Sequence, residues 1–177
     1  MARRPRLLLP DAGAVFGALE HQAWQALVTG YELVIPKIVL AEIQFYVSRD
    51  TGERIEIDTQ AWVDAGAVVA YEASAAELTD TLRLINRPDG PEIHEGEAEA
   101  LTSLRLKVNP ADTGIAFVSA DGAAIQATTL LDLSHTARCL EDVLAAVGYT
   151  KPLAPRYRRE FVERHVREGF ARALRRR

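Results

Sequence analysis

The sequence predicts an α/β fold in which a central parallel sheet is covered by helices on both faces. Short, almost wholly apolar runs alternate along the chain with longer segments whose apolar residues recur at helical spacing. Pro152 and Pro155 then separate a last, strongly basic helical segment from this body. We therefore expect an α/β domain over residues 1–148 and a basic C-terminal helical extension over residues 149–177.

The N-terminal half of the chain is expected to alternate three strands with three helices. Strands are expected at residues 6–10, 32–35 and 67–71, and helices at residues 13–28, 37–49 and 74–85. Val15, Leu19 and Leu27 fall on one face of the first helix. Pro36 fits the first turn of the second helix, because the N–H that it lacks would be unpaired there anyway. The Thr51-Gly52 pair and the Pro and Gly of residues 86–90 mark turns.

The C-terminal half repeats the alternation. Strands are expected at residues 115–119 and 130–133, helices at residues 97–107, 122–129, 136–147 and 158–174, and a loop at residues 109–114. Leu140, Val143 and Leu144 form the apolar face of the helix over residues 136–147. Each apolar run is short enough for a strand that is buried on both faces.

Composition limits the class of protein. A chain of 177 residues, 48% of them hydrophobic, is long enough to bury one sizeable core. The first apolar run stops at Pro10, and no segment approaches the roughly 20 apolar residues of a membrane span. The single cysteine, Cys139, excludes an intrachain disulfide and fits a reducing compartment. We expect a cytoplasmic protein that does not contact the membrane.

Charge is distributed very unevenly along the chain. Residues 151–177 hold ten Lys or Arg and three Glu, a net charge of +7, and residues 1–6 add +3, which leaves −14 for residues 7–150. A basic tail is typical of segments that contact nucleic-acid phosphates. The alternative is that the tail docks on the acidic body or only keeps the protein soluble.

Five acidic residues fall near positions where ligands collect in this fold class. Asp11 ends the first strand and Asp121 follows the fourth, and ligands of open α/β sheets bind at the carboxyl ends of strands. Glu42 lies in the helix after the second strand. Glu97 and Glu99, in the stretch EIHEGEAEAL, open the helix that precedes the Asp121 strand.

Each acid also has a structural explanation when it is taken singly. Asp11 and Asp121 can cap the helices that follow them, and Glu97 and Glu99 can interact with the positive end of a helix. If the acids converge, however, carboxylates about 4 Å apart repel by roughly 4 kcal/mol per pair at an effective dielectric constant near 20, which capping does not offset. A divalent cation does, and oxygen ligands without His or Cys select Mg²⁺ or Mn²⁺. Such a site suits hydrolysis of a phosphodiester.

The ordered set of motifs resembles a PIN domain. It comprises the strand ending in Asp11, VIPKIVLAEI with Glu42 six residues after its Pro, HEGEAEAL, and FVSAD with Ser119 and Asp121 in a Ser/Thr-x-Asp arrangement. The resemblance covers about residues 6–147. It implies a three-layer α/β/α sandwich and a metal-dependent endoribonuclease acting on single-stranded RNA, as in the toxins of VapBC-type toxin–antitoxin pairs.

The resemblance also assigns roles to residues. The catalytic and metal-binding acids would be Asp11, Glu42, Glu97 and Asp121, with Mg²⁺ or Mn²⁺ as the cofactor. Ser119 would hold Asp121 or the metal-bound water by hydrogen bonding. The basic extension would contact RNA through Arg156, Arg158, Arg159, Arg164 and Arg167. A homodimer is expected, with an antitoxin or another protein as a further partner.

The two acids of the EAEA sequence are not equivalent. Related flap-type nucleases use both, so Glu99 is a further candidate ligand beside Glu97. The two residues are about 200° apart around an ideal helix, and both can join one site only if Glu97 lies at the non-helical cap. Glu92 and Glu95 are expected to be solvated, and His94 is expected to stabilise the helix start rather than to catalyse.

Two features depart from the PIN pattern and motivate an alternative function. Many relatives have a second Asp directly before the final acid, where this chain has Ala120, and a minimal PIN domain does not need the tail from Tyr149 onward. The alternative is a catalytically inactive PIN-like module that binds RNA or a protein through residues 150–177. A third possibility is a metal-dependent phosphohydrolase of another α/β family, which is disfavoured because Asp11 lacks the Asp-x-Asp pairing that the aspartyl-phosphate chemistry of haloacid-dehalogenase-like enzymes requires.

Overall fold

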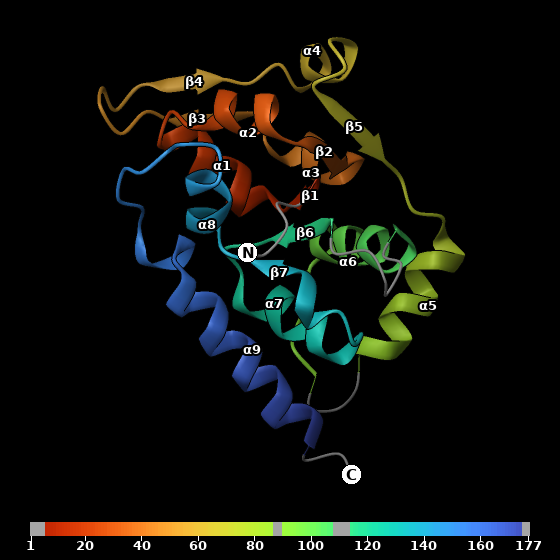
Figure 1. The fold of residues 1–177 in the computed structure, drawn as a ribbon. Coiled ribbons are helices and arrows are strands. Elements are labelled where there is room, and N and C mark those ends of the chain that lie inside the picture. The colour runs from red at the N-terminus through yellow and green to blue at the C-terminus, as the bar shows by residue number, and fades with distance from the viewer. Residues whose placement is uncertain (1–5, 87–89, 108–113, 175–177) are drawn as a thin grey trace.

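A five-stranded parallel sheet forms the centre of the molecule (Figure 1). The structure, a computed structural model, describes residues 6–86, 90–107 and 114–174. The sheet has the order β5-β2-β1-β6-β7, with β1 at Leu7–Pro10, β2 at Glu32–Pro36, β5 at Val68–Tyr71, β6 at Ile115–Val118 and β7 at Ala137–Arg138. All of its strand pairs are parallel. The predicted α/β fold with a central parallel sheet is confirmed.

Helices cover both faces of the sheet. One face packs against α1 (Ala12–Glu20), α2 (Trp24–Gly30), α3 (Lys37–Glu42) and α8 (Leu140–Ala145), and the other against α5 (Ala75–Ile85), α6 (Glu95–Lys107) and α7 (Gly122–Leu130). Successive strand residues point to opposite faces. Leu8 therefore joins the first core and Leu9 the second, and in β2 Leu33 and Val34 divide in the same way.

The order of the strands creates a crevice between β1 and β6. From β1 the chain builds the sheet outward through β2 to β5, and then returns to place β6 on the other side of β1. At such a switch point the loops after the two neighbouring strands diverge and leave room for a ligand. Pro10 pairs with Val118, so that Asp11 and Ser119 leave the sheet side by side.

The C-terminal extension docks on the body. It contains a 3₁₀ turn, η2 (Pro155–Tyr157), and α9 (Arg159–Leu174), which confirms the predicted last helix and lies along α7 (Figure 1). Tyr157 is 1% exposed and belongs to the core that contains α1 and α8. In α7, Gly122 leaves space for the ring of His165, since a Cβ there would lie 2.3 Å from that ring.

Two predicted elements are wrong because non-glycine residues in the left-handed conformation end helices at Gln22 and Asp132. The predicted helix over residues 13–28 is wrong as one element: α1 ends in a Schellman motif in which Gln22 has φ 56° and Ala23 N–H bonds the Ala18 carbonyl at 2.7 Å. The predicted strand at residues 130–133 is also wrong. Asp132, with φ 58°, closes α7 in the same way, and the fifth strand is β7 instead.

Two predicted helices are shorter than expected. The helix over residues 37–49 ends at Glu42, since Phe45–Val47 forms β3 and pairs antiparallel with β4 (Arg54–Glu56) across the predicted turn at Gly52. Aromatic and β-branched side chains favour this pairing. The helix over residues 136–147 is reduced to α8, because the residues before Cys139 pair with β6. The helix α4 (Thr59–Asp64) was not predicted from the sequence.

The remaining predicted elements agree with the structure to within a few residues. The helix over residues 74–85 starts at a capping box formed by Ser74 and Glu77. The loop at residues 109–114 lies outside the described residues except for Gly114. Among the described residues, no helix combines the length and the apolar character that crossing a membrane requires.

Candidate functional site

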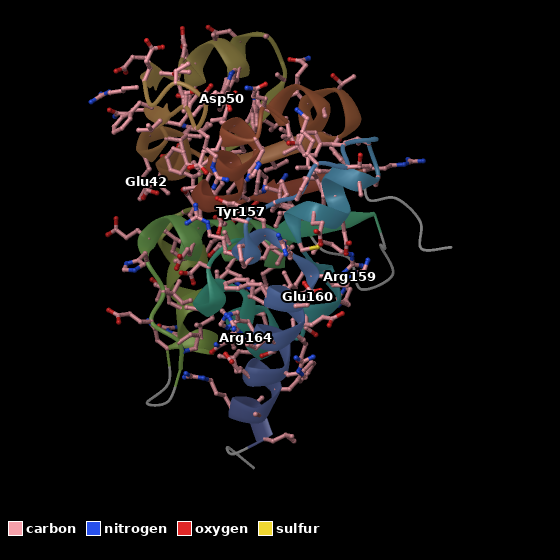
Figure 2. All side chains as sticks on the ribbon, turned by 90° about the vertical axis from the view of Figure 1, so that its left-hand side faces the viewer. Glu42, Asp50, Tyr157, Arg159, Glu160 and Arg164 are labelled. Carbon is pink, nitrogen blue, oxygen red and sulfur yellow. The ribbon has the colours of Figure 1, made fainter. Side chains whose placement is uncertain are left out.

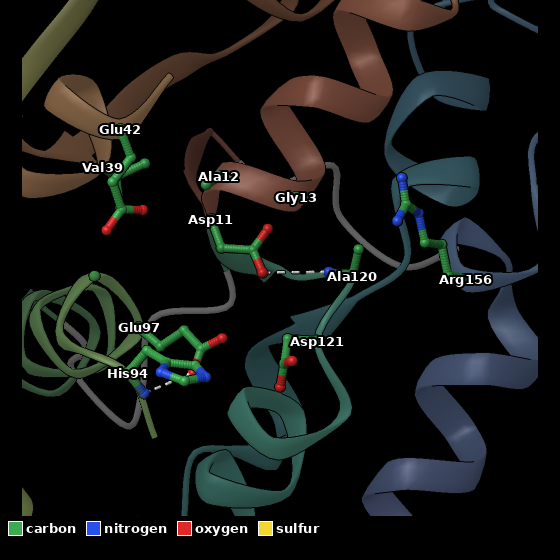
Figure 3. Close-up of a pocket in the computed structure, with 11 residues that line it drawn as sticks. Asp11, Ala12, Gly13, Val39, Glu42, His94, Glu97, Ala120, Asp121 and Arg156 are labelled. Atoms are coloured by element: carbon green, nitrogen blue, oxygen red, sulfur yellow. Dashed lines mark hydrogen bonds between the residues drawn. The ribbon is translucent and has the colours of Figure 1, made fainter. Parts of the chain in front are cut away.

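A pocket of about 450 Å³ lies at the crevice between β1 and β6. The loop after β1, α3, the start of α6 and the loop after β6 supply its walls (Figure 3). Its lining includes four predicted site residues, Asp11, Glu42, Glu97 and Asp121. The fold therefore brings together four acids that are up to 110 positions apart in the chain.

Asp11 is the most deeply buried of these acids, with 4% of its surface exposed. Its Oδ1 accepts a hydrogen bond from Ala14 N–H at 2.6 Å, which caps α1, and its Oδ2 accepts from the Ser119 hydroxyl and from Ala120 N–H at 3.3 Å. Burial raises the pKa of Asp11 from 3.8 to about 6, although these hydrogen bonds lower it in part. The nearby charge of Asp121 adds to the rise. Asp11 is thus held rigidly with its charge poorly solvated.

Asp121 combines a capping role with a place in the pocket. Its Oδ1 accepts from Ala123 N–H at 2.6 Å and Ala124 N–H at 3.0 Å, so it caps α7 as the structural explanation expected. No hydrogen bond to Oδ2 is found among the described residues. One oxygen of Asp121 therefore fixes the side chain while the other remains available to a ligand.

Ser119 links the two aspartates, although not as the resemblance implied. Its hydroxyl donates to the Asp11 carboxylate rather than to the Asp121 carboxylate. The same oxygen accepts from Asp121 N–H at 2.9 Å. Ser119 is 3% exposed and thus positions the side chain of one acid and the backbone of the other.

Glu97 enters the pocket from the first turn of α6. Its Oε2 accepts from His94 N–H at 3.1 Å, the arm of a capping box that reaches back to the helix start (Figure 3). This contact agrees with the expectation that His94 stabilises the helix start. Partial burial raises the pKa of Glu97 from 4.5 to about 7, and the charges of Asp121 and Asp11 contribute to the rise. These electrostatic effects indicate that the three carboxylates interact.

Glu42 is the last residue of α3 and is exposed. Both of its carboxylate oxygens lie 3.3 Å from the place where a Cβ at position 96 would stand. Gly96 thus makes room for this carboxylate beside Glu97. Gly96 was not predicted as a site residue. A glycine in the first turn of a helix is unfavourable there unless it makes room for a neighbour, and this is the signal that could have identified it.

Glu99 does not line this pocket. It is buried, and its carboxylate accepts from Ala73 N–H at 2.8 Å and Ile38 N–H at 3.4 Å. It lines a second, more apolar pocket on the other side of α6. Because α6 begins at Glu95, Glu97 lies within the helix rather than at a non-helical cap, and the two acids turn to opposite sides.

Of the five arginines predicted to contact RNA, Arg156 lines the pocket. The others are engaged along the extension: Arg158 Nε donates to the Leu153 carbonyl at 2.8 Å, and Arg159 pairs with Asp142 at 2.8 Å. Arg164 lies beside His165, and Arg167 is 4.0 Å from Glu163. Figure 2 shows Arg159 and Arg164 along α9, with Tyr157 at its start.

The donor set of the pocket fits a hard divalent cation. Four carboxylates dominate it, with one oxygen of Asp121 and one of Glu97 not engaged by the contacts above, and the imidazole of His94 also lines the pocket. The acids are more spread than a closed cage, since among the described residues the three ligand atoms found within 4.8 Å of one another belong to Cys139, Glu141 and Asp142. Mg²⁺ tolerates such spacing, because it keeps several waters and binds through one or two carboxylates.

The Cys139 group is less suited to a metal than the pocket. Cys139 caps α8 by accepting from Asp142 N–H at 3.3 Å, and burial raises the pKa of its thiol to about 12. Asp142 is already paired with Arg159. The thiolate that a metal needs is therefore strongly disfavoured, and the guanidinium of Arg159 already binds the adjacent Asp142 carboxylate.

A scan against protein-family models found no family that matches the chain, and searches of curated proteins and of solved structures also returned no match. The residues of the pocket are therefore the basis for assigning a function.

Proposed function

We propose that this protein is a PIN-like ribonuclease with a three-layer α/β/α fold, which uses Mg²⁺ or Mn²⁺ to hydrolyse phosphodiester bonds of single-stranded RNA. The observation that carries the proposal is the meeting of Asp11, Glu42, Glu97 and Asp121 in one pocket. These are the four acids that the resemblance to PIN domains selects. The pocket also lies at the switch point of the sheet, where ligands of such folds bind.

The residues that would hold the cation have different tasks. Asp11 and Asp121 are fixed by backbone N–H groups and give the site its geometry. Glu97 and Glu42 approach from α6 and α3. A bound Mg²⁺ or Mn²⁺ supplies an acidified water and stabilises the charge that develops on the phosphodiester. Ser119 keeps Asp11 in place and would act as a positioning residue.

The electrostatics of the pocket favour a cation. The pKa values of Asp11 and Glu97, about 6 and about 7, show that ionising these acids in the metal-free protein is costly. A capping role alone would favour the ionised form instead, since hydrogen bonds from backbone N–H groups lower the pKa of a carboxyl. Burial is the main cause of both rises in pKa, and a cation bound between the carboxylates would offset this cost.

The proposal is tested by metal binding and by cleavage. Titration with MnCl₂ or MgCl₂ should raise the thermal midpoint of the wild-type protein, and a labelled single-stranded RNA should be cut only when the metal is present. Asp11→Asn should weaken both effects, since Asn keeps the shape and the capping oxygen but not the charge. If the metals cause no stabilisation and Asp11→Asn leaves cleavage unchanged, the proposal is wrong.

A second candidate is a PIN-like module without catalysis that binds RNA or a protein through residues 150–177. The wider spacing of the acids and the small side chain of Ala120 favour it. Removing residues 150–177 is unsuitable as a test, because Tyr157 belongs to the core. Charge-reversal variants of exposed α9 residues discriminate instead: lost RNA or partner binding, with no cleavage by the wild type, would support the module.

The PIN resemblance also leads us to propose a homodimer and, if the protein is the toxin of a toxin–antitoxin pair, an antitoxin partner. Light scattering measures the first. Co-purification with the product of an adjacent reading frame tests the second.

A further inference from the structure

The acidic pocket has one strongly basic side chain in its wall. Among the described residues that line it, Arg156 is the single Lys or Arg, and it comes from the C-terminal extension rather than from the sheet or its flanking helices. Figure 3 shows Arg156 on the side of Ala120 that faces away from Glu42 and Glu97. The pocket is therefore polarised, with acids at one side and a guanidinium at the other.

The position of Arg156 is fixed by the residues around it. Its neighbour Tyr157 is 1% exposed and fills the space above Gly17, where a Cβ would lie 2.6 Å from the tyrosine ring. Leu153 is buried in the same core, and its carbonyl accepts from Arg158 Nε at 2.8 Å. Anchors on both sides hold the η2 turn against the body, so that little backbone entropy is lost when Arg156 binds a ligand.

Arg156 is not used by the acids of its own pocket. In the described parts of the chain no carboxylate lies within 4.0 Å of its guanidinium, which instead rests 4.8 Å from the centroid of the Tyr157 ring. By contrast, Arg159 is bound to Asp142. The exposed guanidinium of Arg156 thus retains donors for an anion.

A phosphodiester needs such a donor at this place. Four ionised carboxylates with one divalent cation leave two net negative charges, which repel the phosphates of an incoming strand. A guanidinium presents a planar fork of N–H donors that matches two phosphate oxygens. Arg156 lies opposite Glu42 and Glu97. A strand can therefore cross the pocket with one phosphate at the acids and a neighbouring phosphate at Arg156.

We propose that Arg156 is a substrate-binding residue that holds a backbone phosphate of the strand at the acidic pocket, and that the C-terminal extension is therefore part of the site. This inference depends on the proposed nuclease function for the identity of the strand, but not for the binding of its phosphate. Of the five arginines predicted to contact RNA, it selects Arg156, which lines the same pocket as the acids.

The experiment compares Arg156→Ala, Arg156→Lys and the control Lys151→Ala in the full-length protein. Lys151 is an exposed cation of the same extension that does not line the pocket. Arg156→Ala should raise KM for a single-stranded RNA about tenfold or more, the cost of one hydrogen bond to a charged group. Arg156→Lys should recover part of the loss, because it keeps the charge but not the fork. Lys151→Ala should stay within about twofold of wild type.

Two further measurements separate phosphate binding from a structural role. The urea midpoint and the Mn²⁺ affinity of Arg156→Ala should match those of wild type. Fluorescence anisotropy with labelled RNA, carried out in the Asp11→Asn background so that the strand stays intact, should show weaker binding by Arg156→Ala and a plot of log K against log salt that is shallower by about 0.7.

The outcomes distinguish the two proposals. If the wild type neither cleaves RNA nor responds to metal, the nuclease proposal fails, and Arg156 is judged by anisotropy alone. If Arg156→Ala and Lys151→Ala change KM and RNA affinity equally, or if the wild type does not bind RNA, the assignment of Arg156 is overturned. A lower urea midpoint that accounts for the whole effect would overturn it as well.

Discussion

The metal-free protein should lose stability as the pH rises from 5 to 8, because Asp11 must ionise in a buried site. The pKa of Asp11 is raised from 3.8 to about 6, mainly by burial. Between these two values the folded protein binds more protons than the unfolded chain, so the free energy of unfolding falls with rising pH. Below pH 3.8 both states are protonated, and well above pH 6 both are ionised, so the effect is confined to this window.

The magnitude follows from the change in pKa. A rise from 3.8 to about 6 corresponds to about 3 kcal/mol at about 1.36 kcal/mol per pKa unit. Integrating over the titration, about 1.4 kcal/mol of this falls between pH 5 and pH 8. Asp11→Asn cannot ionise, and its Oδ1 can still accept from Ala14 N–H. The variant should therefore gain about 1.4 kcal/mol relative to wild type between pH 5 and pH 8.

Urea unfolding in EDTA at pH 5, 6, 7 and 8 measures this difference directly. Subtracting the variant from wild type removes the contribution of distant groups that titrate alike in both proteins, whereas Glu97, whose pKa the charge of Asp11 raises, adds to the difference in the same direction. Asp64→Asn removes one carboxylate at an exposed residue outside the pocket and is the matched control. A difference between Asp11→Asn and wild type that is constant from pH 5 to pH 8 would refute the reasoning, since Asp11 would then act as a cap whose charge is not costly.

Three further predictions concern the neighbouring residues. In calorimetric titrations, Mn²⁺ affinity should rise about 100-fold from pH 5.5 to pH 8. Asp11 and Glu97, with pKa values of about 6 and about 7, must lose their protons to bind the metal. An affinity that does not change with pH would contradict direct ligation by both residues. Glu97→Gln should reduce the Mn²⁺-induced rise in thermal midpoint, whereas Glu99→Gln should leave that rise unchanged. Glu99→Gln should instead destabilise the protein by about 1 to 3 kcal/mol, because the Glu99 carboxylate accepts hydrogen bonds from two backbone N–H groups. Equal effects of the two variants on the metal-induced rise would refute the assignment of Glu97 alone to the metal site. Gly122→Ala should destabilise the protein by about 1 to 3 kcal/mol in urea unfolding, because the new Cβ would collide with the His165 ring. Adding His165→Ala should remove most of that cost. If the effects of the two substitutions on the free energy of unfolding simply add, the contact is unimportant.

The sequence was most informative where local chemistry alone determines the structure. The apolar runs that became β1, β2 and β6 are buried on both faces, which is what an apolar run without alternation predicts for a parallel sheet, whereas β5 lies at the sheet edge and leaves Val69 47% exposed. It was least informative where tertiary context overrides propensity. Gln22 and Asp132 end helices in a conformation that glycine usually supplies, so no residue marked the ends of α1 and α7.

The same distinction applies to the pocket. The ordered motifs selected Asp11, Glu42, Glu97 and Asp121, and these meet because the ends of β1 and β6, the end of α3 and the start of α6 adjoin the switch point of the sheet. The place of Arg156 could not be read from the chain. It depends on how Tyr157 docks against the body, and nothing in the tail's composition separates this arginine from its neighbours.

The division between Glu97 and Glu99 depends on the residue at which one helix begins. His94 is not a preferred N-cap residue, so no capping signal favours a start of α6 at Glu95 over a start at Glu97. A start two residues later would have put Glu97 at the cap and allowed both acids to face the pocket. Instead, His94 N–H bonds Glu97, and Glu99 turns away to bind Ala73 N–H. The number of acidic ligands at this site is therefore set by the start of one helix rather than by the number of carboxylates in EIHEGEAEAL.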